Sequence, residues 1–188
     1  MKKGEHLSVI LRSKKTVFSF KDIVLLWGDA GTSAARVRIN YYVKSGKLYR
    51  IRKGFYAKDE NYDKLELATK VFTPSYVSFE TVLAQNGINF QYYNQIFVAS
   101  YLTRDIVCDG QKYSFRKIKD VVLVNSAGID MKGERSIATK ERAFLDMIYI
   151  HKDYHFDNLS SLDWDKVLAL LPMYNNKRMA KKVRELCH

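Results

Sequence analysis

The stretch TSAARVRINYYVKSGKLYRIRKGFYA (32–57) decides the fold class of the first third of the chain. Its first part, 32–47, predicts a helix that carries arginines, because apolar side chains recur there at helical spacing. Its second part, 48–57, alternates around Lys53-Gly54 in the way that is typical of a short hairpin. A helix that leads directly into a basic hairpin is the order of elements that a winged helix-turn-helix needs.

Two shorter helices are predicted ahead of this stretch. The first covers about residues 5–13, where the apolar side chains are compatible with one buried stripe. The second is FKDIVLLWG (20–28), with Ser19 as its N-cap and Asp22 completing a variant of the capping box. Gly28 is expected just past its last turn, because a left-handed backbone at that position favours glycine.

The helix at 32–47 has two distinct faces. At about 100° per residue, one face is apolar and is expected to pack on the preceding helices: Ala35, Ile39, Tyr42 and Val43. The opposite face contains no acidic residue: Ser33, Val37, Asn40, Tyr41 and Lys44, flanked by Arg36 and Arg38. Arg36, Arg38 and Asn40 are of the types that reach base edges in duplex DNA, arginine at guanine and asparagine at adenine. The alternative is a charged helix that contacts only water.

The hairpin at 48–57 adds a second basic surface. The residues expected to face its core are Leu48, Ile51 and Phe55. Those that project from it are Arg50, Arg52 and Lys53. Side chains suited to phosphates fix the position of a protein on DNA without reading its sequence. In this chain they are Thr32 and Ser33 at the expected N-cap of the helix, and Lys44, Lys47, Arg50, Arg52 and Lys53. An ordinary exposed hairpin remains the alternative.

The positive charge of the chain is concentrated in this region. Residues 1–60 contain 14 Lys and Arg against 5 Asp and Glu, a net charge of +9. Residues 61–188 contain 18 against 15, a net charge of only +3. A basic surplus confined to one segment favours a polyanionic partner, so double-stranded DNA is the first partner to consider.

Composition limits the other classes of function. With 47% apolar residues the chain can build a core, and no apolar run approaches the roughly 20 residues of a membrane span. The start lacks the features of a signal peptide, so we expect a cytoplasmic protein. Two isolated cysteines, Cys108 and Cys187, are expected to be ordinary thiols. The four histidines form no zinc-binding pattern, and no metal or cofactor is expected.

A second domain is predicted over 61–188, after a polar linker near residues 59–63. Helices are expected at 64–72, 78–88, 137–151, 164–171 and 176–186, and the last of these is strongly basic. Three β-rich runs are expected to form antiparallel strands: IFVASYLT (96–103), KYSFRKI (112–118) and DVVLVNS (120–126). The predicted class is therefore α+β, with a winged helix-turn-helix at 1–60 followed by helices packed on a small antiparallel sheet.

Three segments resemble a known family, the AbiEi-type antitoxins of type IV toxin–antitoxin (abortive infection) systems. SGKLYRIRKGFYA (45–57) resembles the wing of that family, a Gly-x-Leu strand followed by an arginine-rich Gly-Tyr return. TPSYVSFETVLAQNGI (73–88) is similar to its Pro-Ser-Tyr-(Ile/Val)-Ser helix entry. SIATKERAFLDMIY (136–149) is similar to its Ala-x-x-Glu-Arg-Ala helix, which ends in an aspartate. With the spacing between them, the likeness spans about residues 16–150.

The resemblance implies a bacterial transcriptional repressor that autoregulates its own operon. Its winged helix is expected to bind an operator, an inverted repeat occupied by two copies. Its second domain is expected to counter a nucleotidyltransferase-like toxin without necessarily forming a stable complex with it. The family's C-terminal region is often longer than the part that follows Tyr149 in this chain. A winged-helix regulator without a toxin partner is therefore a first alternative.

Enzyme signatures are not found in the sequence. It contains no phosphate-binding glycine-rich loop, no GxSxG and no nucleotidyltransferase signature. A weaker alternative is a nucleic-acid-processing enzyme that uses Asp105, Asp109 and Asp120, with Lys112 or Lys119, as a nuclease-like strand core. On the 137–151 helix, Arg142 and Asp146 are four residues apart and are expected to form a structural ion pair. We therefore expect a protein that is not an enzyme.

Overall fold

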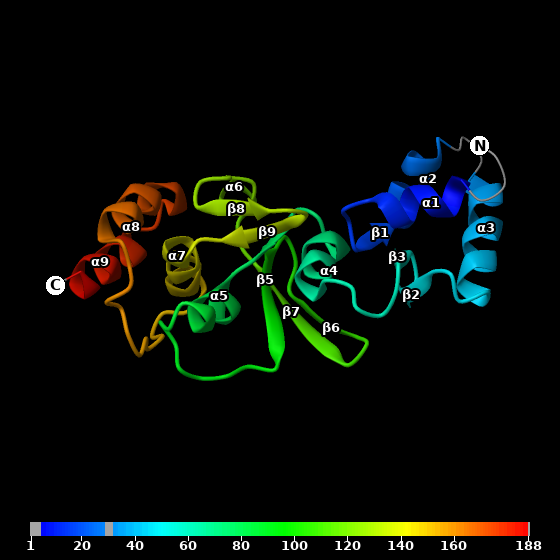
Figure 1. The fold of residues 1–188 in the computed structure, drawn as a ribbon. Coiled ribbons are helices and arrows are strands. Elements are labelled where there is room, and N and C mark those ends of the chain that lie inside the picture. Colours follow the sequence, from blue (N-terminus) through cyan, green and yellow to red (C-terminus); the bar gives the residue numbers. More distant parts are fainter. Residues whose placement is uncertain (1–4, 29–31, 188) are drawn as a thin grey trace. The chain divides into compact units, whose positions relative to one another are not determined.

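The computed structural model describes residues 5–28 and 32–187, apart from the side chain of Thr32. In this part of the chain it contains nine α-helices, one 3-10 helix and two β-sheets, an α+β fold (Figure 1). The chain divides into two compact units, 1–67 and 68–188. This division lies inside a helix, seven residues after the boundary that the sequence pattern predicts, and each unit is described by itself below.

The first unit combines three helices with a small sheet. Its elements are α1 (Glu5–Arg12), β1 (Val17–Ser19), α2 (Phe20–Trp27), α3 (Thr32–Lys44), β2 (Tyr49–Arg52) and β3 (Phe55–Ala57). The three strands pair antiparallel in the order β1-β3-β2. The predicted helices and hairpin are present, and β1 is an additional strand that pairs along the return of the hairpin.

Local hydrogen bonds explain where α2 begins and ends. The Ser19 hydroxyl accepts from the Asp22 amide, and the Asp22 carboxylate accepts from the Ser19 amide at 2.8 Å, a complete capping box. Gly28 ends the helix with φ +60°, in the left-handed region that favours glycine. Both features are as the sequence predicts.

An apolar core joins α1, α2, α3 and the small sheet. Its buried members are Ile10, Phe18, Ile23, Trp27, Ala35, Ile39, Tyr42, Leu48 and Tyr56. Phe55, which the alternation places in the core, is only half-buried, whereas Tyr56 is buried. Phe55 and Tyr56 are consecutive residues of β3 and point to opposite faces of the small sheet, and it is Tyr56 that packs in the core.

The second unit is built on a six-stranded sheet with the order β6-β7-β5-β4-β9-β8. Its strands are β4 (Ser75–Val77), β5 (Gln95–Ser100), β6 (Arg104–Cys108), β7 (Gln111–Lys117), β8 (Ile129–Lys132) and β9 (Arg135–Ala138). Its helices are α5 (Phe79–Gln85), α6 (Asp120–Leu123), α7 (Lys140–Ile150), α8 (Trp164–Leu170), η1 (Leu171–Tyr174) and α9 (Lys177–Leu186). The helix α4 (Lys64–Val71) precedes the sheet and contains the division between the units.

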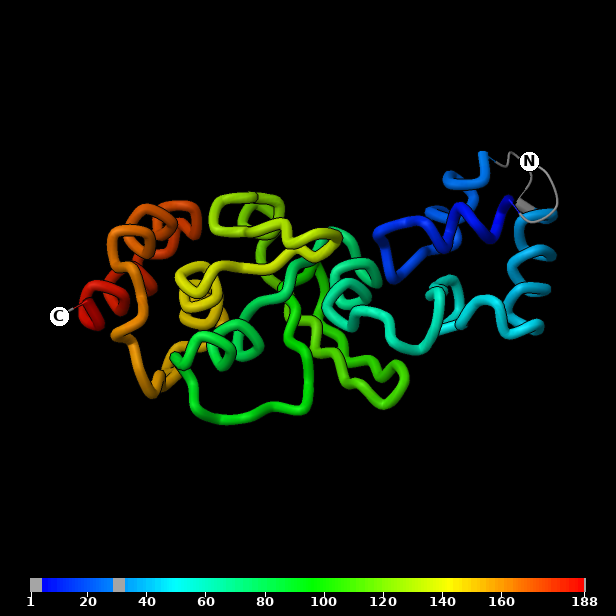
Figure 2. The backbone as a smooth tube through the Cα atoms, in the orientation of Figure 1, coloured from blue at the N-terminus to red at the C-terminus, as the bar shows by residue number. Residues whose placement is uncertain are grey.

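The sheet is mixed, so the prediction of a small antiparallel sheet is wrong. β4 pairs parallel with β9, and β5 pairs parallel with β7. The β6–β7 hairpin folds back so that β7, rather than β6, lies beside β5 (Figure 2). The alternation of side chains along a strand indicates which face is buried but not which strand is its neighbour, and this arrangement was therefore not predictable.

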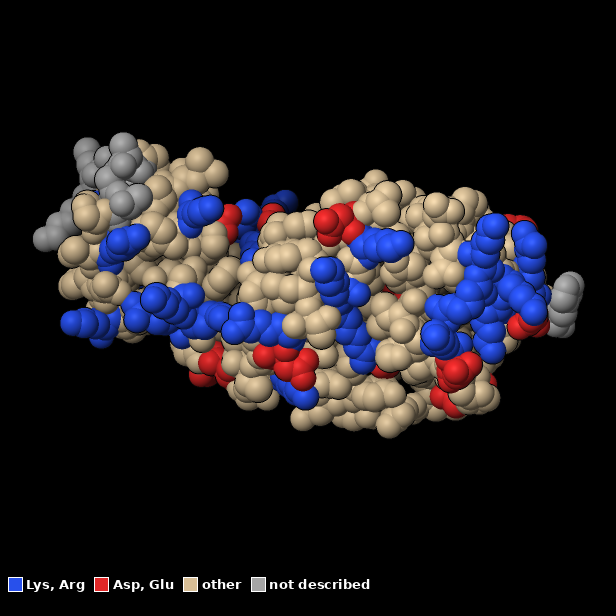
Figure 3. All heavy atoms as spheres, turned by 180° about the vertical axis from the view of Figure 1, so that it is seen from behind, with Lys and Arg blue, Asp and Glu red and all other residues tan. Residues whose placement is uncertain are grey.

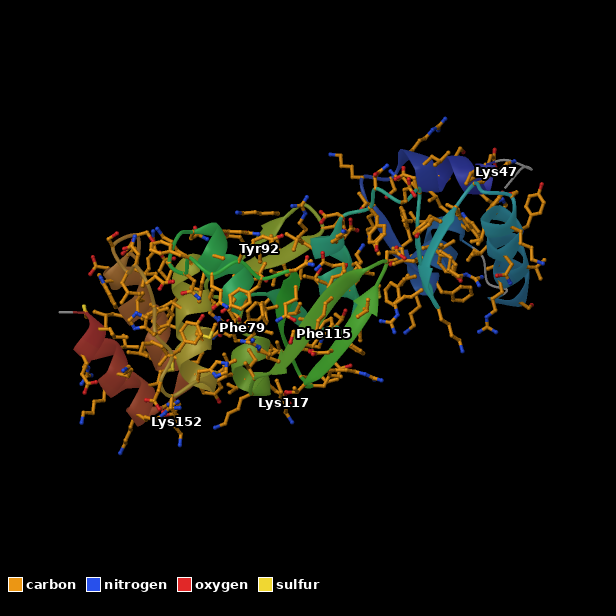
Figure 4. All side chains as sticks on the ribbon, turned by 90° about the horizontal axis from the view of Figure 1, so that it is seen from below. Lys47, Phe79, Tyr92, Phe115, Lys117 and Lys152 are labelled. Carbon is orange, nitrogen blue, oxygen red and sulfur yellow. The ribbon has the colours of Figure 1, made fainter. Side chains whose placement is uncertain are left out.

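The predicted strand DVVLVNS is also wrong, because residues 120–123 form the short helix α6. In this helix Val122 and Leu123 are buried while Val121 is 66% exposed. Tertiary packing has overridden the β-propensity of the valines. The fully buried Phe79 and Phe115 belong to the core of this unit, where α5 packs against α7 and β5 (Figure 4). Among the described residues, no helix has the length and apolar character needed to cross a membrane.

Candidate nucleic-acid interface

A basic cleft lies between the exposed side of α3 and the β2–β3 hairpin in the first unit. It has a volume of about 630 Å³ and is lined by Phe20, Arg36, Asn40, Arg50, Lys53, Gly54 and Tyr56. Arg36 and Asn40 are four residues apart on α3, so their side chains leave the helix on the same side. Arg50 comes from β2, and Lys53 and Gly54 form the turn that follows, where Gly54 has φ +86°.

Aromatic rings support the cations of this cleft. The guanidinium of Arg36 lies 5.4 Å from the centre of the Phe20 ring, and that of Arg50 lies 5.8 Å from the Tyr56 ring. Such cation–π contacts hold a guanidinium in place without neutralising its charge. Arg50 also donates a hydrogen bond from Nη2 to Oδ1 of Asn40 at 2.5 Å, which links the hairpin to α3.

The charge of the cleft is not compensated by nearby acids. In the described part of the chain, no carboxylate forms an ion pair with Arg36, Arg50 or Lys53. Arg36, Arg50 and Lys53 line the same cleft, and all three side chains are exposed. The arrangement therefore presents several fixed positive charges to an anion that enters the cleft.

The structure brings together four of the ten residues that the sequence pattern selects: Arg36, Asn40, Arg50 and Lys53. Arg38 is half-buried and lies on another side of α3, with its guanidinium 5.2 Å from the Trp27 ring. Arg52 is half-buried, and its buried Nη1 atom has no hydrogen-bond partner among the described residues. These two arginines therefore do not belong to the cleft.

The remaining predicted residues lie elsewhere on the first unit. Ser33, Lys44 and Lys47 are exposed but do not line the cleft; Lys47 follows the end of α3 (Figure 4). The side chain of Thr32 lies outside the described residues. The sequence pattern does not select Phe20 or Tyr56. Tyr56 could have been identified from the pairing of the hairpin, because it lies opposite Arg50 on the neighbouring strand.

A second basic surface lies on α9 in the other unit. Lys177, Lys181 and Arg184 line a shallow cleft of about 470 Å³, together with Ala180 and Glu185. Lys and Arg side chains gather visibly near this end of the chain (Figure 3). Arg178 points elsewhere and donates to the carbonyl oxygens of Ile148 and Tyr149, at the end of α7. Its role is therefore to satisfy the last turn of α7.

The Arg142–Asp146 pair on α7 lies at the centre of a buried network. Both side chains are 0% exposed, and Nε of Arg142 is 3.4 Å from Oδ1 of Asp146. The guanidinium also donates to the carbonyl oxygens of Ala127 and Val122, at 2.6 and 2.7 Å. The Asp146 carboxylate accepts from the hydroxyls of Tyr76, Ser78 and Tyr174, at 2.9, 2.8 and 2.7 Å.

This network is structural in character. Burial raises the pKa of the Asp146 carboxyl from its ordinary value, against the opposing effect of Arg142 and the hydroxyl donors. The hydroxyl of Ser78 is used here, and α5 has no side-chain hydrogen bond at its N-cap although Ser78 occupies that position. The network joins the segments 73–88 and 136–149, and the five side chains that form it are all buried: Tyr76, Ser78, Arg142, Asp146 and Tyr174.

The aspartates considered for a nuclease-like core occupy three different settings. Asp105 on β6 is exposed and pairs with Lys112 on β7 at 3.2 Å, and its pKa is lowered by hydrogen bonding to Ser114 and Lys112. Asp109 lies in the β6–β7 turn, and Asp120 begins α6, so only Asp105 of the three lies on a strand. The described residues include no group of three or more His, Cys, Asp or Glu side chains arranged to hold a metal ion.

Comparison with known proteins does not assign the chain to a family. No protein-family model matches the sequence, and a search of curated proteins finds no significant match.

Proposed function

We propose that this protein is a winged helix-turn-helix regulator that binds double-stranded DNA through the basic cleft of its first unit. The observation that carries the proposal is the convergence of Arg36, Asn40, Arg50 and Lys53 on one cleft with no acidic partner among the described residues. In this interpretation α3 is the recognition helix and β2–β3 is the wing.

The roles of the cleft residues follow from their chemistry. Arg36, on the exposed face of α3, is suited to the O6 and N7 atoms of guanine. Arg50 and Lys53, on the wing, are suited to phosphates, which position the protein but carry no sequence information. Asn40 accepts from Arg50 and so couples the wing to the helix. We therefore propose that Asn40 orients Arg50, in addition to the adenine contact predicted for it.

The resemblance to AbiEi-type antitoxins extends this proposal to a biological role. We propose a cytoplasmic, non-enzymatic repressor that binds an inverted repeat as two copies and counters a nucleotidyltransferase-like toxin encoded beside it. Co-expression with the neighbouring reading frame tests the antitoxin role, and restored growth is the expected result. If that frame is harmless or encodes no nucleotidyltransferase, the regulator without a toxin partner is favoured.

DNA binding is tested by fluorescence anisotropy with a duplex from the region upstream of the gene. Arg36→Ala is expected to weaken specific binding by about 1–3 kcal/mol. Lys117→Ala is the matched control, because Lys117 is an exposed cation of the second unit (Figure 4), and it is expected to leave the affinity unchanged. Equal effects of the two substitutions would contradict the proposed interface. Cleavage of the duplex in Mg²⁺ that Asp105→Ala abolishes would instead support the enzyme alternative.

A further inference from the structure

An apolar side chain lies at the centre of the outward face of α3. Val37 is 71% exposed, although it is in the middle of a 13-residue helix. At about 100° per residue it points nearly opposite to the buried stripe of Ala35, Ile39 and Tyr42. Its neighbours on the exposed face, Asn40 and Tyr41, are three and four residues further along.

Helix stability does not explain a valine at this position. Valine has a lower helix propensity than alanine, lysine or glutamate, because its branched Cβ loses rotameric freedom in a helix. An exposed position also gives it no buried contacts within the unit. The same branching fixes its two methyl groups in one strongly preferred rotamer, so the apolar surface that it presents is well defined.

The surroundings of Val37 indicate what covers it. Apart from Ala34, which is exposed, and Tyr41, which is 60% exposed and lies against Tyr42, its neighbours on this face are polar or basic: Ser33, Arg36, Asn40 and Lys44. A mostly polar and basic face, on which the exposed apolar side chains are few, fits duplex DNA better than another apolar protein surface. In the major groove, the C5-methyl of thymine is the apolar group that each A·T pair presents.

We propose that Val37 is a specificity-determining residue that recognises thymine, by packing its methyl groups on the C5-methyl of a thymine in the major groove. This inference rests on the proposed binding of duplex DNA by α3. The inference adds two points to that proposal. The protein recognises a thymine next to the base that Arg36 contacts, and this contact is apolar and involves no hydrogen bond.

Replacing thymine by deoxyuridine tests the contact, because it removes only the C5-methyl group. The probe is the tightest-binding duplex selected by the full-length protein from a random DNA library, with each thymine replaced in turn. At one position of the bound site, deoxyuridine is expected to lower the affinity about fourfold, which corresponds to one buried methyl group. Val37→Ala is expected to bind the thymine and deoxyuridine duplexes equally.

The control variant is Leu25→Ala, which truncates an 82% exposed apolar side chain on α2 and is expected to retain the thymine preference. If the wild-type protein binds no duplex in a salt-dependent manner, the proposed function itself fails. If it binds tightly but no deoxyuridine substitution matters, or if Val37→Ala keeps the preference, only the thymine contact is overturned. Weakened self-association of Val37→Ala with an unchanged thymine preference would show that a second copy covers the valine, and this also overturns the contact.

Discussion

Asp146 shows how much of the second unit depends on a single buried charge. Its carboxylate is 0% exposed and accepts hydrogen bonds from three hydroxyls as well as from Arg142. Removing one member of a buried pair leaves the other charge without compensation. We therefore expect Asp146→Ala to lower the free energy of unfolding by about 3–5 kcal/mol, measured by urea denaturation.

The matched control for this substitution is Asp105→Ala, which breaks the exposed pair with Lys112. Exposed pairs contribute little, and a loss below about 1 kcal/mol is expected. Similar losses for the two variants would show that the network around Asp146 is not the structural centre that its geometry indicates.

The two buried tyrosines of this network make stability depend on alkaline pH. Burial raises the pKa of Tyr76 and of Tyr174 well above the ordinary value, and the nearby Asp146 carboxylate acts in the same direction. In the unfolded chain both hydroxyls ionise near pH 10. The free energy of unfolding is therefore expected to be unaffected by these groups below about pH 10 and to fall as the pH rises further.

Ultraviolet absorbance of tyrosinate, followed together with circular dichroism, checks this expectation. The last part of the signal from the 13 tyrosines should appear only as the fold is lost. In Tyr174→Phe, this late part should be smaller. Complete ionisation while the dichroism is still native would contradict the buried position of these hydroxyls.

The sequence predicts the ion pair of Arg142 and Asp146 but not the tyrosines that donate hydrogen bonds to Asp146. Arg142 and Asp146 are separated by one helical turn, and that spacing is visible in the chain. Tyr76 and Tyr174 lie 70 and 28 residues from Asp146, and only the folded sheet and η1 bring them to it. The same limit applies to the cleft, where Arg36 and Asn40 share a helix face but Phe20 and Tyr56 are added by tertiary packing.

At the scale of elements, the capping box of α2 gives the most direct prediction. The Ser19 hydroxyl accepts from the Asp22 amide, and α2 supplies Ile23 and Trp27 to the core. Replacing a serine N-cap by alanine leaves that amide without a partner. Ser19→Ala is expected to lower stability by about 1 kcal/mol, measured by thermal and urea unfolding.

Ser160→Ala, at an exposed serine outside the helices, is the corresponding control and should change stability by less than about 0.5 kcal/mol. Retention of full stability by Ser19→Ala would show that α2 does not depend on its cap. It would then be held mainly by the burial of Ile23 and Trp27.

Helices were predicted better than strands, for a physical reason. Helix signals are local: Ser19, Gly28 and the periodic apolar residues of α3 lie within a few turns of the structure they specify. Strand partners are distant, and β4 pairs with β9 across some 60 residues of chain. The run at 120–126 has the composition of a strand, yet the packing of Val122 and Leu123 makes it a helix.

At the scale of the whole molecule, the uneven distribution of charge is evident from the sequence alone, because residues 1–60 carry a net charge of +9. The structure adds the direction of individual side chains: Arg36, Arg50 and Lys53 meet in one cleft, whereas Arg38 and Arg52 pack against the unit itself. Charge counts alone do not distinguish cations that are available to a ligand from those that are partly buried.

The salt dependence of duplex binding tests the central claim most directly. If about five cations neutralise phosphates, log K against log salt should have a slope of roughly −4 to −5. The triple variant Lys44→Gln, Arg50→Gln, Lys53→Gln, at three exposed positions suited to phosphates, should reduce the slope to about −2, since each lost phosphate contact removes about one unit. The charge-matched variant Lys117→Gln, Lys132→Gln, Lys152→Gln, at exposed positions of the second unit, should retain the full slope. A slope near zero for the wild-type protein, or equal reductions in the two triple variants, would contradict the assignment of this cleft to DNA.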